Sequence, residues 1–241
     1  MDVTYCDTET TSLREPHLPT GRRVWEVALV RVPEDGSRPL AAWLQVTDVD
    51  LAHADPEALR IGKFTERFVL GCDDHAGCAR GYGPLGRAVA RPWGDPRPVE
   101  LWGCTEANAG ETIAQLTAGA VIAGSNPIFD MASFADLLRR HGQLGMAEEP
   151  RWYHHPRDVP NWASGWLRAR AAVTGTDGSP AGDGWTGASY STRVISEALG
   201  VPEPADRHSA WADVLWMMDL DAAIGGPSAR LKPAPLATLG A

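Results

Sequence analysis

Residues 2–13 read DVTYCDTETTSL, a short apolar stretch that runs into acidic and hydroxyl side chains. Val3 and Tyr5 are two positions apart, as in a β-strand with one buried face, so the stretch predicts a strand that ends in a polar loop. Asp7 and Glu9 are also two apart, so in an extended chain both carboxylates lie on one side, roughly 7 Å apart along the backbone. Such a pair can share a metal ion, although an isolated Asp-x-Glu pair is more often solvated.

The segments that follow predict strands first and helices later. Residues 25–32 and 40–46 are β-rich and are separated by the turn EDGSRP at 34–39, which is typical of an antiparallel meander. A helix at 105–116 precedes a short apolar strand at 120–124. Helical patterns recur at 129–141, 159–173, 191–199 and 207–224. This order predicts an α/β fold, a mixed sheet of about five strands flanked by helices.

The length and the local composition predict one domain with one insertion. We expect a single domain over residues 1–225 and a flexible tail over 226–241. Between residues 62 and 104 periodicity fades and Gly and Pro become dense, so this segment is expected to be an insertion or long loop.

Four side chains in or near that insertion could hold a structural zinc ion. Cys72, His75 and Cys78 have the spacing C-x2-H-x2-C, and Cys104 lies downstream as a fourth candidate ligand. Zinc sites usually contain paired C-x2-C units, so a zinc site is less favoured here than side chains that bind no metal. Four cysteines are too few for a disulfide scaffold in a chain of 241 residues.

The composition excludes several classes of protein. With 44% hydrophobic and 22% charged residues, the chain is neither disordered nor fibrous. The net charge of −9 argues against a protein that coats nucleic acid through a broad basic face. No stretch approaches the ~18 apolar residues of a membrane span, so we expect a soluble cytoplasmic protein that does not bind membranes.

Three further polar residues matter in the second half of the chain. Asp130 lies in the first turn of the helix predicted at 129–141, where the helix dipole alone would favour a carboxylate. His208 and Asp213 are five positions apart, which on one helix would turn them about 140° away from each other. If they cooperate, His208 must lie at or before the first turn of its helix.

Three motifs occur in a fixed order: Asp-Thr-Glu-Thr-Thr at 7–11, Asn-Pro-x-Phe-Asp at 126–130, and His-x-x-x-x-Asp at 208–213. In this order they resemble the DEDDh, or DnaQ-like, family of 3′ to 5′ exonucleases, whose fold is RNase H-like. The resemblance covers residues 1 to about 60 and about 110 to 225. It implies one catalytic group: Asp7, Glu9, Asp130 and Asp213 as metal-binding carboxylates, with His208 as general base. It also implies a substrate-binding group: Thr10, Leu13, Asn126 and Phe129.

The implied activity is hydrolysis at the 3′ ends of single-stranded DNA or RNA, with release of nucleoside 5′-monophosphates. Four converging carboxylates would repel one another unless cations neutralised them, and oxygen ligands favour two Mg²⁺ or Mn²⁺ ions. Two such ions can hold the attacking and leaving oxygens of an in-line displacement.

Two other functions stay open: a catalytically silent nucleic-acid-binding protein, and an oligoribonuclease-like enzyme for very short oligonucleotides. The sequence leaves open the choice of DNA or RNA, the oligomeric state, and whether a polymerase or another replication or repair protein is a partner.

Aromatic and basic side chains could assist such an activity, although most of them have ordinary structural explanations. Asp158 is interpreted as a structural residue or a helix N-cap. Candidates for a stacking platform are Trp93, Trp102, Trp152, Trp162, Trp166 and Trp185. Candidates for phosphate contacts are Arg139, Arg140, Arg151, Arg157, Arg168 and Arg170.

Overall fold

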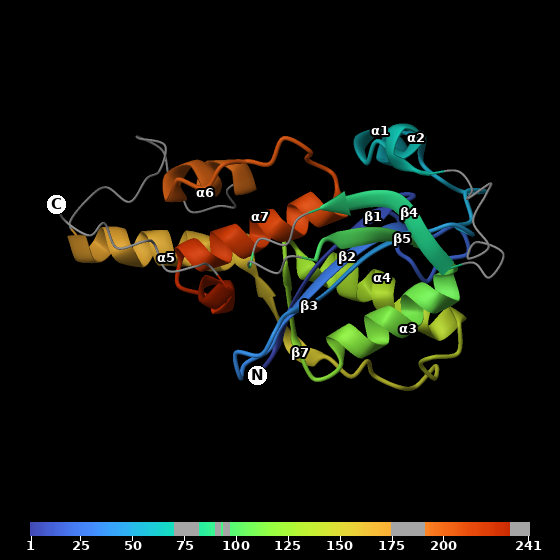
Figure 1. Cartoon of the computed structure of the whole chain (residues 1–241), viewed down its shortest axis with the longest axis horizontal. Helices are drawn as coiled ribbons and strands as arrows, with labels where there is room; N and C mark the ends of the chain where they lie inside the picture. The colour runs from blue at the N-terminus through green and yellow to red at the C-terminus, as the bar shows by residue number, and fades with distance from the viewer. Residues whose placement is uncertain (70–81, 90–92, 94–96, 175–190, 232–241) are drawn as a thin grey trace.

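The computed structural model describes residues 1–69, 82–89, 93, 97–174 and 191–231, and it contains one seven-stranded sheet in the order β4-β5-β3-β2-β1-β6-β7 (Figure 1). The strands are β1 (Val3–Thr10), β2 (Val24–Val32), β3 (Leu40–Val46), β4 (Tyr82–Val89), β5 (Val99–Cys104), β6 (Val121–Gly124) and β7 (Tyr153–Asp158). β2 is antiparallel to β1 and β3, whereas β6 and β7 continue the sheet parallel to β1. This order confirms the predicted α/β fold with a mixed sheet.

Helices cover both faces of the sheet (Figure 1). They are α1 (Pro56–Ile61), α2 (Phe64–Arg67), α3 (Glu106–Thr117), α4 (Pro127–Arg140), α5 (Val159–Thr174), α6 (Thr192–Leu199) and α7 (Ala210–Ala223), and a 3-10 helix η2 (Pro227–Leu231) follows. Side chains alternate along β1, so Tyr5 packs in one core with α5, α6 and α7, while Cys6 packs in the other with α3 and α4. No helix in the described part of the chain is long and apolar enough to cross a membrane.

The segment 62–104, expected to be an insertion or long loop, contributes two strands to the sheet in its described part, so that part is not a loop. β5 pairs in parallel with β3, β4 pairs with the outer side of β5, and the sheet has seven strands instead of about five. Leu101 of β5 is buried in the core. The sequence of β4 does not predict a strand, because Gly83, Pro84 and Gly86 interrupt the apolar alternation. Glycine and proline are tolerated there because β4 is an edge strand.

Two other features differ from the sequence prediction. β7 has the sequence YHHPRD, which lacks apolar alternation and contains Pro156, because it is the other edge strand. Part of the flexible tail predicted over 226–241 is ordered, since η2 covers Pro227–Leu231 and the buried Ser228 hydroxyl donates a hydrogen bond to the Met218 carbonyl at 2.6 Å. Residues 232–241 lie outside the described part.

Candidate active site

The polar end of β1 forms one wall of a cavity of about 200 Å³. Asp7 and Glu9 project toward α7, as their spacing of two predicts, and meet His208 and Asp213 there. The four side chains therefore come together from the two ends of the sequence, because α7 packs directly against β1.

Asp130 lies behind this cavity, on the α4 side of β1. It is buried in the first turn of α4, and its Oδ1 accepts a hydrogen bond from the Thr8 hydroxyl at 2.6 Å. Thr8 alternates with Asp7 and Glu9, so it faces the layer that contains α4. The structure thus brings Asp130 to the same strand end, in the layer opposite to Asp213.

His208 precedes α7, as the spacing to Asp213 required. Its backbone has a φ of 62°, in the left-handed region that a residue other than glycine rarely adopts. The His208 N–H donates a hydrogen bond to Asp213 Oδ2 at 3.1 Å, and Arg67 donates one to the His208 carbonyl. These two bonds hold the loop in the conformation that turns the imidazole toward the carboxylates.

Ligand atoms of three side chains are close enough to hold one cation. One atom each of Glu9, His208 and Asp213 lies within 4.8 Å of the other two. Asp213 Oδ1 is buried and has no hydrogen-bond partner among the described residues, although Arg207 Nε lies 3.1 Å from it as an ion pair. A buried carboxylate oxygen without a hydrogen bond has free lone pairs, which a cation could use.

Glu9 depends on a buried arginine that the sequence did not point to. Glu9 and Glu26 face each other across β1 and β2, which alone would be repulsive. Arg67 Nη1 lies 4.0 Å from Glu9 Oε1, and its Nη2 hydrogen-bonds Glu26. Arg67 is 7% exposed and comes from α2, which no motif marks. Trp43 Nε1 donates to the other Glu26 oxygen at 2.6 Å.

Gly62 allows Glu9 to lie against the turn between α1 and α2. A Cβ at this position would be 2.8 Å from Glu9 Oε2 and 3.1 Å from the Trp25 ring. Any larger residue would push the Glu9 carboxylate from its place.

Burial and mutual repulsion raise the pKa values of the carboxylates. Burial, then the charges of Asp130 and Asp213, hold the pKa of Asp7 well above its usual range. Burial and Glu26 raise the pKa of Glu9 to about 8, and burial raises that of Asp130 to about 7. Without a cation, this cluster would hold extra protons at neutral pH.

The pKa of Asp213 is raised as well, mainly by burial, although Arg207 opposes the shift. The pKa of His208 is lowered by burial and by the positive charge of Arg207. Its imidazole is therefore neutral at pH 7 and can accept a proton.

The four predicted substrate-binding residues have different environments. Leu13 is 79% exposed, which is unusual for a leucine, and Asn126 is exposed with a φ of 53°. Phe129 is half-buried below the Arg22 guanidinium, 3.8 Å from its ring centroid. Thr10 is buried and its hydroxyl donates to the Ser12 carbonyl at 2.9 Å, so that hydroxyl supports the loop after β1.

Arg22 is a second buried cation that no motif indicated. It donates hydrogen bonds to Ser133 Oγ at 2.8 Å, to the Phe129 carbonyl at 3.0 Å and to the Arg14 carbonyl at 2.8 Å. These bonds tie the loop after β1 to the first turns of α4, and so fix Asp130 relative to β1.

Two minor predictions have different outcomes. The N-cap interpretation of Asp158 is confirmed, since its Oδ1 accepts a hydrogen bond from the Asn161 N–H at 3.1 Å. For the zinc site, Cys72, His75 and Cys78 lie outside the described residues. Burial raises the pKa of the Cys104 thiol to about 12, which opposes the thiolate form that a ligand needs. The zinc site stays a prediction.

Comparison with known proteins yields a likeness of shape. Sixteen chains of solved structures match this chain. One is from an ExoI/SSB-Ct complex. It is 16% identical with a TM-score of 0.47, over 95% of this chain and 42% of that one, so this chain spans about two fifths of its length. No protein-family model and no curated protein matches the sequence. The fold assignment above therefore rests on the strand order and not on this likeness.

Proposed function

We propose that this protein is a metal-dependent 3′ to 5′ exonuclease that releases nucleoside 5′-monophosphates from single-stranded DNA or RNA. The observation that carries the proposal is the meeting of Asp7, Glu9, His208 and Asp213 around one cavity, with Asp130 behind it. These residues come from all three motifs, and their raised carboxylate pKa values indicate a site that needs positive charge.

The residues present fit a pair of hard divalent cations. The proposed donor set consists of carboxylate oxygens, which suits Mg²⁺ or Mn²⁺. Asp7, Glu9 and Asp213 would hold the ions at the cavity, and Asp130 would do so from the α4 side. When bound, the cations stabilise negative charge on the phosphoryl oxygens and acidify water.

His208 is the general base of the proposed reaction. Its imidazole takes a proton from the attacking water, whose oxygen forms a new bond to the terminal phosphorus. The bond between that phosphorus and the 3′-oxygen of the preceding nucleotide breaks, and a solvent water protonates the 3′-oxygen, which leaves as a hydroxyl; His208 then returns its proton to solvent. The Asp213 carboxylate and Arg67, which bond the backbone on either side of the imidazole, keep the base in place.

The exposed Leu13 would contact the terminal nucleotide. An apolar side chain that is 79% exposed, two residues after the first motif, gains by packing against a base. Asn126 and Phe129, at the start of α4, would contact the same 3′ end of the nucleic-acid strand.

Incubation with 5′-labelled single-stranded DNA and RNA oligonucleotides tests the proposal. With Mg²⁺ or Mn²⁺, we expect a ladder that shortens from the 3′ end, and a chelator should abolish it. Asp7→Ala should remove the activity and Arg60→Ala, a change at an exposed site, should not. Absence of cleavage of every strand would contradict the proposal and favour a binding protein. Cleavage of dinucleotides only would favour the oligoribonuclease-like alternative.

A further inference from the structure

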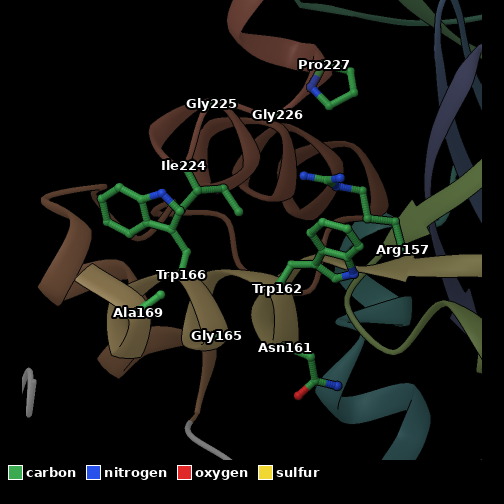
Figure 2. A pocket seen from close by; sticks show the side chains of 10 residues that line it. All are labelled: Arg157, Asn161, Trp162, Gly165, Trp166, Ala169, Ile224, Gly225, Gly226 and Pro227. Carbon is green, nitrogen blue, oxygen red and sulfur yellow. The ribbon is translucent and has the colours of Figure 1, made fainter. Parts of the chain in front are cut away.

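A second and larger cavity lies away from the cluster of carboxylates. It measures about 780 Å³, within the range of small-ligand sites. Figure 2 shows Trp162 and Trp166 projecting into it from α5, with Ile224 on the opposite side. The two tryptophans are four positions apart, so they lie on the same face of the helix. Trp162 is 57% exposed.

The cavity lies at the far end of α7 from the active site. Asp213 is in the first turn of α7 and Ile224 is its C-cap, so about 16 Å of helix separates them at 1.5 Å per residue. Successive nucleotides of a strand are ~3.4 Å or more apart, so up to about five nucleotides would span that distance.

Arg157 places a fixed guanidinium at the edge of the cavity, where its Nη2 forms an ion pair with Asp221 Oδ1 at 2.6 Å. Its guanidinium lies 4.3 Å from the Trp162 ring centroid, and Figure 2 shows the two side chains together. Arg157 Nε donates to Asp221 Oδ1 at 2.7 Å, and the fully buried Asp221 also accepts a hydrogen bond from the Tyr5 hydroxyl at 2.5 Å. Asp221 of α7, itself held by Tyr5 of β1, therefore keeps the guanidinium in one orientation. Neither Asp221 nor Tyr5 lines the cavity.

The helix that carries the tryptophans differs in charge from the rest of the chain. The chain has a net charge of −9, but α5 contains two arginines and no acidic residue. The exposed Arg170 lies 5.3 Å from the Trp166 ring centroid. Each indole therefore has an arginine beside it. Arg170 adds a positive charge that is complementary to phosphate, whereas Arg157, whose charge is balanced by Asp221, offers N–H donors beside a surface for stacking.

We infer that this cavity binds a base of single-stranded nucleic acid upstream of the 3′ end that is being cleaved. The inference rests on the proposed function for its ligand. A base stacks on Trp162 or Trp166, and the neighbouring phosphates lie near Arg157 and Arg170. The site is a second point of contact with the nucleic-acid strand, in addition to the active site. Only strands long enough to reach it would use it.

Two variants test the site without disturbing the core. Trp162→Ala removes a mostly exposed ring. Gly165→Leu fills the cavity from its floor, because a Cβ at Gly165 meets no other atom within 4 Å and leucine favours a helix more than glycine does. Val173→Ala is the matched control, since Val173 is on the same helix, is 88% exposed and does not line the cavity.

Binding of labelled strands to the full-length protein is measured by fluorescence anisotropy, with chelator present to prevent hydrolysis. For a 12-nucleotide strand we expect Trp162→Ala and Gly165→Leu to raise Kd on the order of tenfold, as loss of one stacked base would. Val173→Ala should leave Kd unchanged, and binding of a dinucleotide should be equal for all four proteins.

The outcomes separate this inference from the proposed function. If strands are hydrolysed but both variants bind the 12-nucleotide strand as the wild type does, this site is wrong and the exonuclease proposal stands. If the variants lose binding while no strand is hydrolysed by the wild type, the site is supported and the exonuclease proposal is wrong. If a free nucleoside 5′-monophosphate binds as tightly as the 12-nucleotide strand, the inferred ligand is wrong.

Discussion

Asp7 is the residue at which stability and the proposed activity conflict most directly. Its half-buried carboxylate lies near Asp130, Asp213 and Glu9, and each of these charges raises its pKa. Such a group is costly to ionise unless a cation is bound.

Asp7→Asn should therefore separate the two properties. In chelator at pH 8, we expect the variant to have a higher Tm than the wild type, because an amide does not carry the free-energy cost of ionising a carboxyl group beside other carboxylates. Hydrolysis should fall by at least a hundredfold, because an amide is a poor ligand for a hard cation. Differential scanning fluorimetry and the ladder assay measure both. A lower Tm together with full activity would contradict the assignment of Asp7.

Arg67 should act as a positioning residue for Glu9 and His208. Arg67→Ala leaves Glu26 buried without its partner, which is expected to cost about 3–5 kcal/mol of unfolding free energy. The double variant Arg67→Met with Glu26→Gln removes both charges and should recover most of that loss.

Enzyme kinetics of the Arg67 and Glu26 variants show whether this ion pair positions catalytic groups or only stabilises the fold. We expect the folded double variant to keep KM within about twofold and to lose about tenfold or more in kcat, since a small displacement of a catalytic group is costly. Arg60→Ala, on the adjacent α1, is the control and should change neither constant. An unchanged kcat in the double variant would show that Arg67 serves the fold alone.

The sequence indicated the side chains that we propose to bind cations or to transfer protons, but not the side chains that position them. Asp7, Glu9, Asp130, His208 and Asp213 are recognisable because their chemistry restricts the residue type and the spacing. Arg67 and Glu26 had no such signal, since their pairing joins α2 to β2 over 41 positions and depends on tertiary structure alone.

Among the elements, the best predicted were those with an uninterrupted pattern. The expected strand at 40–46 is β3, and the helix expected at 159–173 is α5 within one residue. β4 and β7 were missed because edge strands tolerate glycine, proline and charge, so their sequences do not alternate.

The structural role of β5 can be measured by a cavity-forming substitution. Leu101 is 2% exposed and packs in the core beneath α7. Leu101→Ala is expected to lower the unfolding free energy by about 2–5 kcal/mol. Leu51→Ala, at a 42% exposed leucine, is the control and should change it by less than about 0.5 kcal/mol. If Leu101→Ala and Leu51→Ala cause the same small change in unfolding free energy in urea denaturation, the segment around β5 is dispensable for stability.

At the scale of the whole molecule, the cluster of carboxylates links stability to pH and to cations. The pKa of Glu9 rises from 4.5 to about 8 on folding, and that of Asp130 from 3.8 to about 7. An acid with a raised pKa in the folded state favours folding while it is protonated. That contribution is present at low pH and is lost as the pH rises through the folded pKa.

In chelator, Tm should therefore fall as the pH rises from 5 to 8. Addition of Mg²⁺ or Mn²⁺ at pH 8 should restore it, because a ligand that binds only the folded state stabilises that state. Thermal melts over this pH range, with and without the cation, make the measurement. A Tm that rises with pH in chelator would indicate that the carboxylates are not clustered in the folded protein.

The alternation of side chains along β1 has a consequence for how chains of this kind can diverge. Odd-numbered residues from Tyr5 to Glu9 face α7, whereas Cys6 and Thr8 face α4. One inserted or deleted residue within β1 would exchange the two sets, placing carboxylates against an apolar layer and a thiol in the cavity. The turn at 34–39 has no such constraint. During evolution, length changes should therefore accumulate in such turns, while the spacing from Val3 to Glu9 stays fixed.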